Sequence, residues 1–348
     1  MKTLITGGNG YIGSHLATAL LEKGHSLHAL IYPGTDASEL LAQGVKVFTG
    51  DIRDYHSVER AAEGCAQVYH LASYVSLWAP KPGIFYDINV KGTQNLLNVC
   101  RNNGVRRVLV CSSCAVFGPS ANGGTVDEMT DYTSRLKGHY EWSKLQQVEV
   151  AKNYMDDGLE LVFVYPTRVF GPRIKSASNA VSVILEGVLR GTWRFIPGNG
   201  KSVANYVFVI DVVKGMQLAM EKGGNGEGYI LSGHHVTYGR LFEMVLEAAG
   251  QRPRCFIRIP YPVMWLAGSS LELYSKLTGK NPLITRHSAG KFNAAWKVSS
   301  EKIRQSLGFE PTPMRDAILT TVEAILEGRT TTSTPSKQAL REGRPVFV

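Results

Sequence analysis

The stretch GHYEWSK, residues 138–144, places a phenol and an amine, Tyr140 and Lys144, four residues apart. On a helix such residues are neighbours, with Cβ atoms about 5–6 Å apart. An ammonium about 4 Å away favours a phenolate by at most roughly 4 kcal/mol, which would lower a tyrosine pKa toward neutrality. We therefore predict that Tyr140 exchanges a proton with a substrate oxygen. Taken alone, the pair is more typical of an idle, solvated helix, so the prediction depends on its neighbours in the sequence.

A glycine-rich loop strengthens that prediction. The stretch LITGGNGYIGSH, residues 4–15, joins the first expected strand to the first expected helix. Glycines at such a turn allow the chain to bend tightly, backbone amides to approach a pyrophosphate, and the helix to pack on the strand. A glycine triplet alone indicates only a tight turn. Between a strand and a helix it predicts a dinucleotide site, formed here by Gly7, Gly10, Tyr11, Ile12 and Gly13.

The residues at the end of the second expected strand do not decide between NAD and NADP. The adenosine ribose is read there, about 20 residues beyond the glycine loop. Tyr32 stands at this point, and it is neither the acid that binds the ribose of NAD nor the arginine that binds the phosphate of NADP. The missing acid favours NADP, whereas Asp36 nearby argues against it. Asp51, after the third strand, either bonds the adenine or caps the following helix.

Two hydroxyl groups, Ser112 and Ser113, end the fifth expected strand in RVLVCSSCAVFG. Ligands bind at the carboxyl ends of parallel strands, so a hydroxyl there can hydrogen-bond a substrate oxygen. Cys111 and Cys114 form a CxxC pattern in the same stretch. Because the run reads as a buried strand, we interpret both as buried thiols, and we expect no metal site.

These features together resemble the extended short-chain dehydrogenase/reductase family, from Lys2 to about Glu327. Other stretches that resemble it are HLAS at 70–73, NVKGTQNLL at 89–97, YPTRVFGP at 165–172 and NYVFVIDVVKG at 205–215. The resemblance implies a catalytic set of Ser113, Tyr140 and Lys144 with a nicotinamide cofactor. The family pattern SSxxVYG assigns the catalytic serine to Ser113 rather than Ser112.

The resemblance also implies a role for each of these residues. Tyr140 would give a proton to a carbonyl oxygen that Ser113 orients, while the nicotinamide delivers hydride. Lys144 would hold the nicotinamide ribose and lower the tyrosine pKa, and Asn89 would support the site. The implied cofactor site further includes Tyr32, Asp51, Ile52, Leu71, Ala72, Asn89, Ser112, Tyr140, Lys144, Tyr165, Pro166 and Thr167.

Two branches of the family compete for the substrate. Sugar-nucleotide epimerases and dehydratases typically carry Arg-Asp-Phe where this chain has Ala204-Asn205-Tyr206, which removes a charge that a diphosphate would want. The stretches YVSLWAPKPGIFYDINVKGT and GHYEWSK resemble dihydroflavonol-reductase-like and 3β-hydroxysteroid-dehydrogenase-like members instead. This likeness implies an apolar substrate pocket, to which we assign Trp78 and Phe170 beside Ser113 and Tyr140. An equally good explanation of Trp78 is an aromatic side chain in a loop that packs on the subdomain.

We therefore expect an NAD(P)-dependent oxidoreductase that interconverts a secondary alcohol and a ketone on a largely apolar, ring-containing substrate such as a flavonoid, steroid or terpenoid. The alternative is a sugar-nucleotide epimerase or dehydratase that uses the same three residues. A third hypothesis, a non-catalytic sensor of the NAD(P)H ratio, would need only the glycine loop, and the complete Ser-Tyr-Lys set argues against it.

Repeated βαβ units must position these residues. Apolar runs predict strands at Lys2–Thr6, Ser26–Ile31, Val45–Thr49, Gln67–Leu71, Arg107–Ser112 and Leu159–Tyr165. Helical periodicity predicts a first helix ending at Gly24 and others at Ile84–Asn103, Tyr140–Asp156, Val181–Arg190, Leu241–Ala249 and Pro313–Glu327. The expected fold is α/β, with a Rossmann-type doubly wound parallel sheet and a smaller C-terminal α/β substrate-binding subdomain. The expected domains are residues 1–170 with returning segments near 205–235, then 171–328, and a mobile tail at 329–348.

Composition limits the partners. The 348 residues are 44% hydrophobic, enough for a sizeable core. The net charge of +9 comes from scattered basic residues without interleaved aromatics, so we expect a small-molecule substrate and no nucleic acid. With no apolar run of about 18 residues, we expect no membrane span and a cytoplasmic protein. Five cysteines, an odd number, argue against a disulfide framework.

Two surfaces are left open. The stretch IPYPVMWLAGSSLEL, residues 259–273, is apolar enough to touch a membrane or a greasy substrate, but we expect a helix packed in the subdomain. The helices at 84–103 and 140–156 would form a homodimer through a four-helix interface, although ordinary surface helices show the same pattern.

Overall fold

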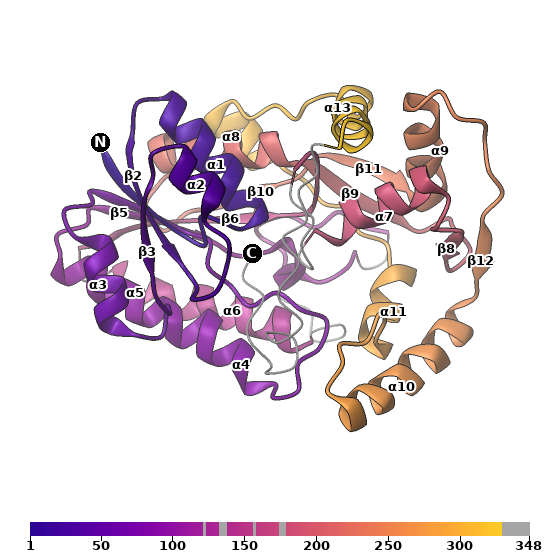
Figure 1. Cartoon of the computed structure of the whole chain (residues 1–348), viewed down its shortest axis with the longest axis horizontal. Helices are drawn as coiled ribbons and strands as arrows, with labels where there is room; N and C mark the ends of the chain where they lie inside the picture. The colour runs from indigo at the N-terminus through magenta and orange to yellow at the C-terminus, as the bar shows by residue number, and fades with distance from the viewer. Residues whose placement is uncertain (121–122, 132–137, 156–157, 174–178, 329–348) are drawn as a thin grey trace.

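The centre of the molecule is a sheet of seven strands, all parallel, in the order β10-β6-β5-β4-β1-β2-β3 (Figure 1). This computed structural model describes residues 1–120, 123–131, 138–155, 158–173 and 179–328, so the expected tail at 329–348 lies outside the described residues. The six predicted strands are confirmed to within one residue at each end, and β10 is a seventh strand that was not predicted. The strands are β1 (Lys2–Thr6), β2 (Ser26–Ile31), β3 (Lys46–Thr49), β4 (Gln67–His70), β5 (Arg107–Cys111), β6 (Glu160–Pro166) and β10 (Gly228–Leu231).

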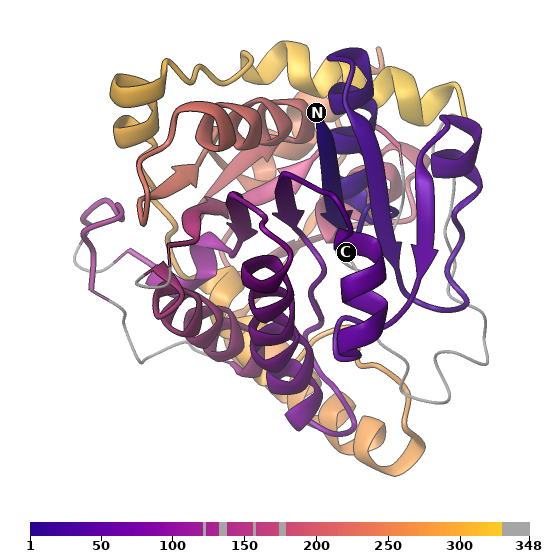
Figure 2. The same cartoon turned by 90° about the vertical axis from the view of Figure 1, so that its left-hand side faces the viewer.

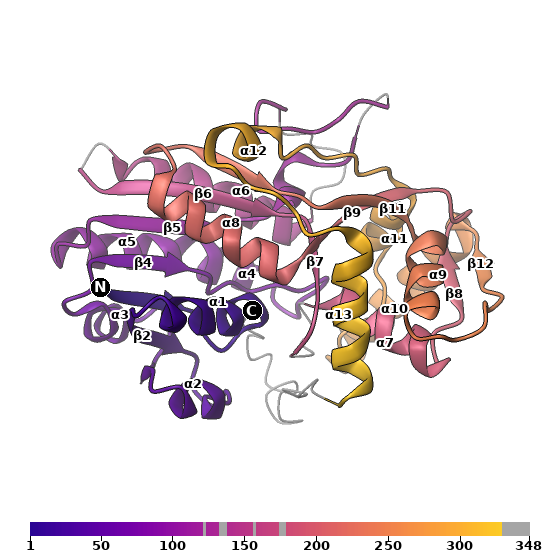
Figure 3. The same cartoon turned by 90° about the horizontal axis from the view of Figure 1, so that it is seen from above.

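Helices cover both faces of the sheet (Figures 1 and 3). One buried apolar cluster draws on α1 (Tyr11–Glu22), α2 (Ser38–Ala42), α8 (Val209–Lys222) and α12 (Glu301–Leu307). The cluster on the opposite face draws on α3 (Tyr55–Ala62), α5 (Gly92–Asn102) and α6 (His139–Lys152). Strands buried on both faces read as continuous apolar runs, which is why they were visible in the sequence. The predicted doubly wound fold class is confirmed.

The predicted helix at Ile84–Asn103 is continuous but not uniform. It consists of α4 (Gly83–Tyr86), a π-helical turn η1 (Asp87–Lys91) and α5. Such turns are frequent at functional sites. Asn89 lies in this one, completely buried.

The strand order places a crevice beside the glycine loop. From β1 the order runs outward through β2 and β3 on one side and through β4, β5 and β6 on the other. The loops that follow β1 and β4 therefore leave in opposite directions and open a crevice between them. In sheets of this kind ligands bind at the carboxyl ends of the strands at this switch point.

The later elements gather beyond the carboxyl ends of the strands (Figures 1 and 3). A second sheet has the order β11-β9-β7, and β12 pairs with β8. Three helices enclose a third apolar cluster with the second sheet. These elements are β7 (Arg168–Phe170), α7 (Ala180–Arg190), β8 (Phe195–Pro197), β9 (Val203–Phe208), β11 (His234–Thr237), α9 (Tyr238–Ala248), β12 (Ile257–Ile259) and α13 (Met314–Leu326).

The apolar stretch at 259–273 forms a helix, α10 (Tyr261–Thr278), followed by α11 (Arg286–Asn293). α10 packs on α11 of the subdomain, as predicted, but only through a narrow face. Only Met264, Gly268 and Ser275 of this helix are buried, and most of its large apolar side chains are exposed. α10 lies at the outer rim of the molecule (Figures 1 and 2). Among the described residues no helix is both long enough and apolar enough to cross a membrane.

The turn between β1 and α1 is tight. Gly7 N donates to Leu30 O at 3.0 Å, and Gly10 N donates to Gly7 O at 3.0 Å. Gly7 has a φ of 72°, in the left-handed region that favours glycine. Gly13 has no room for a side chain, because an added Cβ would lie 2.2 Å from Gly7 O. The first turn of α1 therefore packs directly on the loop.

We expect Gly13→Ala to lower the free energy of unfolding by about 1–3 kcal/mol, since the methyl group must displace backbone. Urea denaturation followed by circular dichroism measures this. Gly83, the first residue of α4, has open space where a Cβ would lie. The matched control Gly83→Ala should leave stability unchanged or raise it by up to about 1 kcal/mol. Equal stabilities for the two variants would contradict the packing described for Gly13.

Candidate active site

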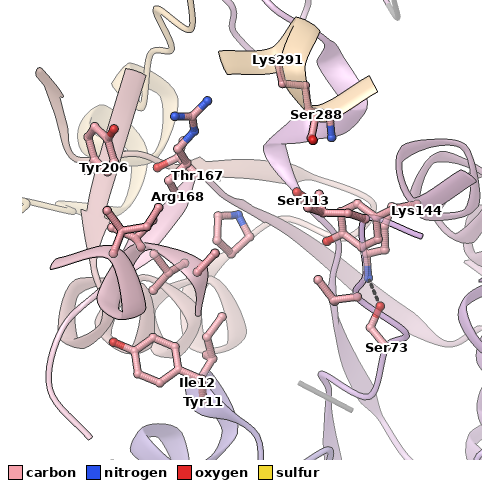
Figure 4. A pocket seen from close by; sticks show the side chains of 18 of the residues that line it. Tyr11, Ile12, Ser73, Ser113, Lys144, Thr167, Arg168, Tyr206, Ser288 and Lys291 are labelled. Atoms are coloured by element: carbon pink, nitrogen blue, oxygen red, sulfur yellow. Dashed lines mark hydrogen bonds between the residues drawn. The ribbon is translucent and has the colours of Figure 1, made fainter. Parts of the chain in front are cut away.

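A cavity of about 300 Å³ opens at the carboxyl ends of the central strands (Figure 4). Ser113 reaches it from the end of β5, and Tyr140 and Lys144 reach it from α6. The fold thus brings the three predicted catalytic residues together. Besides Tyr140 and Lys144, six further residues of the predicted cofactor site line the same cavity: Tyr11, Ile12, Leu71, Ser112, Pro166 and Thr167.

Lys144 is a buried cation, with 1% of its surface exposed. Its Nζ donates to the Cys111 carbonyl oxygen at 2.6 Å and to Ser73 Oγ at 3.3 Å. Burial lowers the pKa of Lys144 to about 8, because the ammonium loses its hydration. Ser112 Oγ donates to the Lys144 carbonyl oxygen at 3.2 Å, which fixes this turn of α6 to the end of β5.

Tyr140 is poised as a proton donor. Burial raises the pKa of Tyr140 above its usual range, and a hydrogen bond with the Ser113 side chain acts in the opposite direction. The prediction that Lys144 lowers the tyrosine pKa toward neutrality is wrong for this arrangement. The ammonium is bound to Cys111 and Ser73, and loss of hydration disfavours the phenolate. The phenol and the Ser113 hydroxyl are therefore the pair that can meet a substrate oxygen.

Asn89 supports the site from behind. Its Oδ1 accepts from Ser73 Oγ at 3.0 Å and from Tyr74 N at 2.7 Å, and its Nδ2 donates to Ser143 Oγ at 2.8 Å. Asn89 thus orients Ser73, which in turn contacts Lys144. It is a positioning residue rather than a cavity wall. Ser73 was missed by the sequence analysis, although the motif HLAS contains it.

A smaller groove lies beyond the glycine loop, lined among others by four residues of the predicted cofactor site: Gly7, Tyr32, Ile52 and Ala72. The N-terminus of α1 lies between this groove and the larger cavity. Its cap residue is Gly10, which has no side chain to bond the first amides of the helix. Its first amides are therefore available to a phosphate. These residues fit the two ends and the pyrophosphate of a nicotinamide dinucleotide.

Asp51 does not cap α3, so that alternative is wrong. The cap is Asp54, whose carboxylate accepts from Ser57 N at 3.1 Å. The Asp51 carboxylate instead holds Arg53, accepting from its Nε at 2.9 Å and from its amide N at 2.9 Å. The hydrogen bonds that the Arg53 guanidinium donates to Asp51 raise its pKa.

Three predicted contact residues lie elsewhere. Phe170 is in the subdomain core, where its ring packs 5.9 Å from that of Phe208. Tyr165 is buried on the α6 side of the sheet, with its ring 4.9 Å from that of Phe117. Trp78 is not among the residues that line the cavity, and Val75 and Leu77 of the same loop line it instead.

Cys111 and Cys114 are buried free thiols, as interpreted from the sequence. Burial raises the pKa of Cys111 to about 11 and that of Cys114 to about 12. Both therefore stay protonated at neutral pH and are poor nucleophiles.

Arg168 is the most consequential residue that the sequence analysis missed. It lines the cavity from β7 (Figure 4), with its guanidinium 5.9 Å from the ring centre of Tyr206 and 5.6 Å from that of Tyr238. It also donates to the Tyr238 hydroxyl. No carboxylate in the described part of the chain forms an ion pair with it. The cavity thus contains an arginine, contributed by β7, although the sequence has none at the two positions before Tyr206.

The far wall of the cavity comes from α11, which contributes Ser288, Lys291 and Phe292. Lys291 forms an ion pair with Glu141, the neighbour of Tyr140 in the sequence. Glu141 is 2% exposed and also accepts from Gly138 N at 2.8 Å. The pair fixes α11 over the catalytic helix. No local pattern could have revealed it, because 150 residues separate its two members.

Lys144→Met should stabilise the fold at neutral pH. The folded-state pKa lies below the usual 10.5, so the destabilising effect of the buried charge is fully present below about pH 8 and disappears as the pH rises through 10.5. Removing the charge relieves a desolvation cost of about 3 kcal/mol, and the variant loses two hydrogen bonds. We therefore expect the free energy of unfolding to rise by about 1–2 kcal/mol at pH 7.

Urea unfolding at pH 7 and at pH 10.5 tests this expectation, and the gain should be absent at the higher pH. Lys91→Met is the control, because the Lys91 side chain is 59% exposed. A Lys144→Met variant destabilised equally at both pH values would contradict the burial argument.

Comparisons with known proteins bear on this geometry. Residues 3–232 match the model of the NAD dependent epimerase/dehydratase family. Sterol demethylase protein B of Methylococcus capsulatus is 31% identical, over 91% of this chain and 96% of its own length. A putative dihydroflavonol 4-reductase of Synechocystis is 30% identical, over 67% and 68%. The mouse sterol-4-alpha-carboxylate 3-dehydrogenase, decarboxylating, is 25% identical, over 93% and 90%.

Among solved structures, UDP-glucose 4-epimerase of Thermotoga maritima with UDP-glucose matches with a TM-score of 0.77 and 23% identity, covering 94% of this chain and 99% of that one. Likeness at this identity establishes the fold alone. The family model and the relative with 31% identity go further. The chain therefore belongs to the NAD-dependent epimerase/dehydratase family, the extended short-chain dehydrogenases/reductases, and is an enzyme of this oxidoreductase type.

Proposed function

We propose that this enzyme interconverts a secondary alcohol and a ketone on a largely apolar, ring-containing substrate of the steroid type. The observation that carries the proposal is the meeting of Ser113, Tyr140 and Lys144 in a cavity with apolar walls. Those walls include Val75, Leu77, Val181, Ile184, Leu241 and Phe242. The sterol enzymes among the relatives support the same class of substrate.

Each catalytic residue has a distinct task in this reaction. Ser113 orients the substrate oxygen, and Tyr140 supplies its proton. The high pKa of Tyr140 keeps the phenol protonated at neutral pH, which favours reduction of a ketone. The nicotinamide supplies the hydride when bound. Lys144, still largely protonated below its pKa of about 8, places a positive charge beside the reacting groups.

We also propose NADP as the preferred cofactor. Tyr32 lines the adenosine groove and carries no charge that would repel a phosphate. The Asp36 carboxylate, which argued against NADP, accepts from Ser38 N at 2.9 Å and is thus engaged by the start of α2. Titration of the purified protein with NADPH and NADH tests the preference.

Tyr140→Phe should lower turnover of a 3-ketosteroid by about 100-fold or more, because the proton donor is removed. NADPH oxidation at 340 nm measures the rate, and NADPH binding by fluorescence titration should stay within about 2-fold of wild type. Tyr86→Phe, at an exposed tyrosine of α4, is the control. Full turnover in Tyr140→Phe would refute the assigned role.

We further infer that the substrate carries an acidic group that meets Arg168. A guanidinium without a carboxylate partner is costly in an apolar cavity, and a carboxylate of the ligand would compensate it. The name of the decarboxylating relative describes a sterol carboxylate, which supports this inference.

Arg168→Met should raise KM for a 3-hydroxysteroid 4-carboxylate by about 10-fold or more, and change KM for its methyl ester by less than about 2-fold. Arg240→Met, at an exposed arginine of α9, should change neither value. Equal effects of Arg168→Met on acid and ester would remove the acidic group from the proposal while leaving the reaction class intact.

A sugar-nucleotide epimerase remains the second candidate, since Arg168 would also suit a diphosphate. Such an enzyme would convert UDP-glucose to its epimer without a net change in absorbance at 340 nm.

Three further points also stay proposals: the division at residue 170 into cofactor and substrate parts, a homodimer through α4, α5 and α6, and a cytoplasmic location, which the five free cysteines favour.

A further inference from the structure

Helix α10 carries an apolar stripe that nothing in the described part of the chain covers. Leu266, Leu273 and Leu277 are 63%, 62% and 79% exposed. They are spaced i, i+7 and i+11, so they lie along one line of the helix, and Val263 and Tyr274 flank that line. The buried residues of α10, Met264, Gly268 and Ser275, lie on the opposite side. We call Val263, Leu266, Leu273, Tyr274 and Leu277 the α10 stripe.

Apolar side chains continue beyond both ends of the helix. Leu283, after the helix, is 91% exposed. Before it, Ile257 of β12 is 63% exposed, and its strand partner Phe195 is 43% exposed. Trp265 and Tyr261 are also exposed, at 44% and 37%. A surface this apolar marks an interaction site rather than ordinary solvated protein.

The charge of the same segment identifies the partner. Residues 251–297 contain eight lysines and arginines and a single acidic residue, Glu272. Glu272 is engaged by Arg286, accepting from its amide N at 2.7 Å and from its Nε at 2.9 Å. Lys291 is paired with Glu141 in the cavity wall. The exposed surface is nevertheless apolar and basic, because six of the eight cations are exposed: Arg252, Arg258, Lys276, Lys280, Arg286 and Lys297. A second copy of the chain would bring the same positive charge against it in a two-fold contact, whereas an anionic bilayer complements both properties.

We propose that α10 docks this enzyme on the surface of an anionic phospholipid membrane. The helix has 18 residues, so it is about 27 Å long and lies in the plane of the interface with the α10 stripe among the acyl chains. Lys276 and Lys280 meet lipid phosphates.

The docking helix is coupled to the cavity. Gly268 packs so closely on the start of α11 that an added Cβ would lie 2.7 Å from the Thr285 carbonyl carbon. α11 in turn lines the cavity through Ser288, Lys291 and Phe292. A ligand dissolved in the bilayer would thus reach the cavity beside the membrane surface. This step rests on the apolar substrate proposed above; the membrane contact does not.

Sedimentation of the full chain with large vesicles at about physiological salt tests the contact. The vesicles contain either phosphatidylcholine alone or phosphatidylcholine with about 30% phosphatidylglycerol. We expect wild type to bind the anionic vesicles at least about 10-fold more tightly than the neutral ones. The triple variant Leu266→Gln, Leu273→Gln, Leu277→Gln should lose binding at least about 10-fold. Lys276→Gln with Lys280→Gln should weaken binding to the anionic vesicles only.

The matched control replaces three exposed leucines elsewhere, Leu41→Gln, Leu319→Gln and Leu326→Gln, and should bind like wild type. Thermal unfolding and NADPH binding show that each variant is folded, and neither readout depends on the steroid. Equal binding by the α10 triple variant and wild type would overturn the proposal. A second result would also overturn it: wild type that does not bind vesicles, is a dimer in sedimentation equilibrium, and becomes monomeric in the triple variant. That result would assign the α10 stripe to a contact with a second copy of the chain.

Discussion

The buried ammonium of Lys144 is the constraint on which the crevice depends. A cation removed from water must be compensated by oriented oxygens, and here these are the Cys111 carbonyl and the Ser73 hydroxyl. Ser73 is held by Asn89, and Asn89 also bonds Ser143 on the catalytic helix. Because these groups come from the loop after β4, the end of β5, the π-helical turn and α6, one charge fixes the relative positions of four elements.

A second buried charge closes the site from the other side. Glu141 follows Tyr140 on α6, and its carboxylate binds Lys291 of α11. A buried ion pair adds little net stability, but each partner is costly to leave alone, so the pair fixes where α11 must lie. The catalytic helix is thereby held to the sheet through Lys144 and to the subdomain through Glu141. The cavity between them is therefore bounded on both sides by contacts of a buried charge.

Two further features, Arg168 in the cavity and the exposed apolar face of α10, are each suited to a different partner. Within the cavity, Arg168 contacts Tyr206 and Tyr238 and pairs with no carboxylate among the described residues, so it is available to a ligand. On the outside, α10 exposes apolar side chains, whereas an ordinary surface helix packs its apolar side chains against the core. Both features are unfavourable for the isolated chain. Each becomes favourable when the molecule meets a partner of the matching chemistry, an anion in the cavity and a bilayer at the rim.

The sequence by itself determined the central sheet, the glycine turn and the spacing of Tyr140 and Lys144, because apolar periodicity and glycine geometry are local. It could not decide which face Phe170 and Tyr165 present, since both suit a core or a pocket until neighbours are known. Tertiary structure alone placed Arg168 over Tyr206, Lys291 against Glu141, and the α10 stripe in solvent. Burial and charge compensation depend on which distant segments meet, and local pattern carries no record of that.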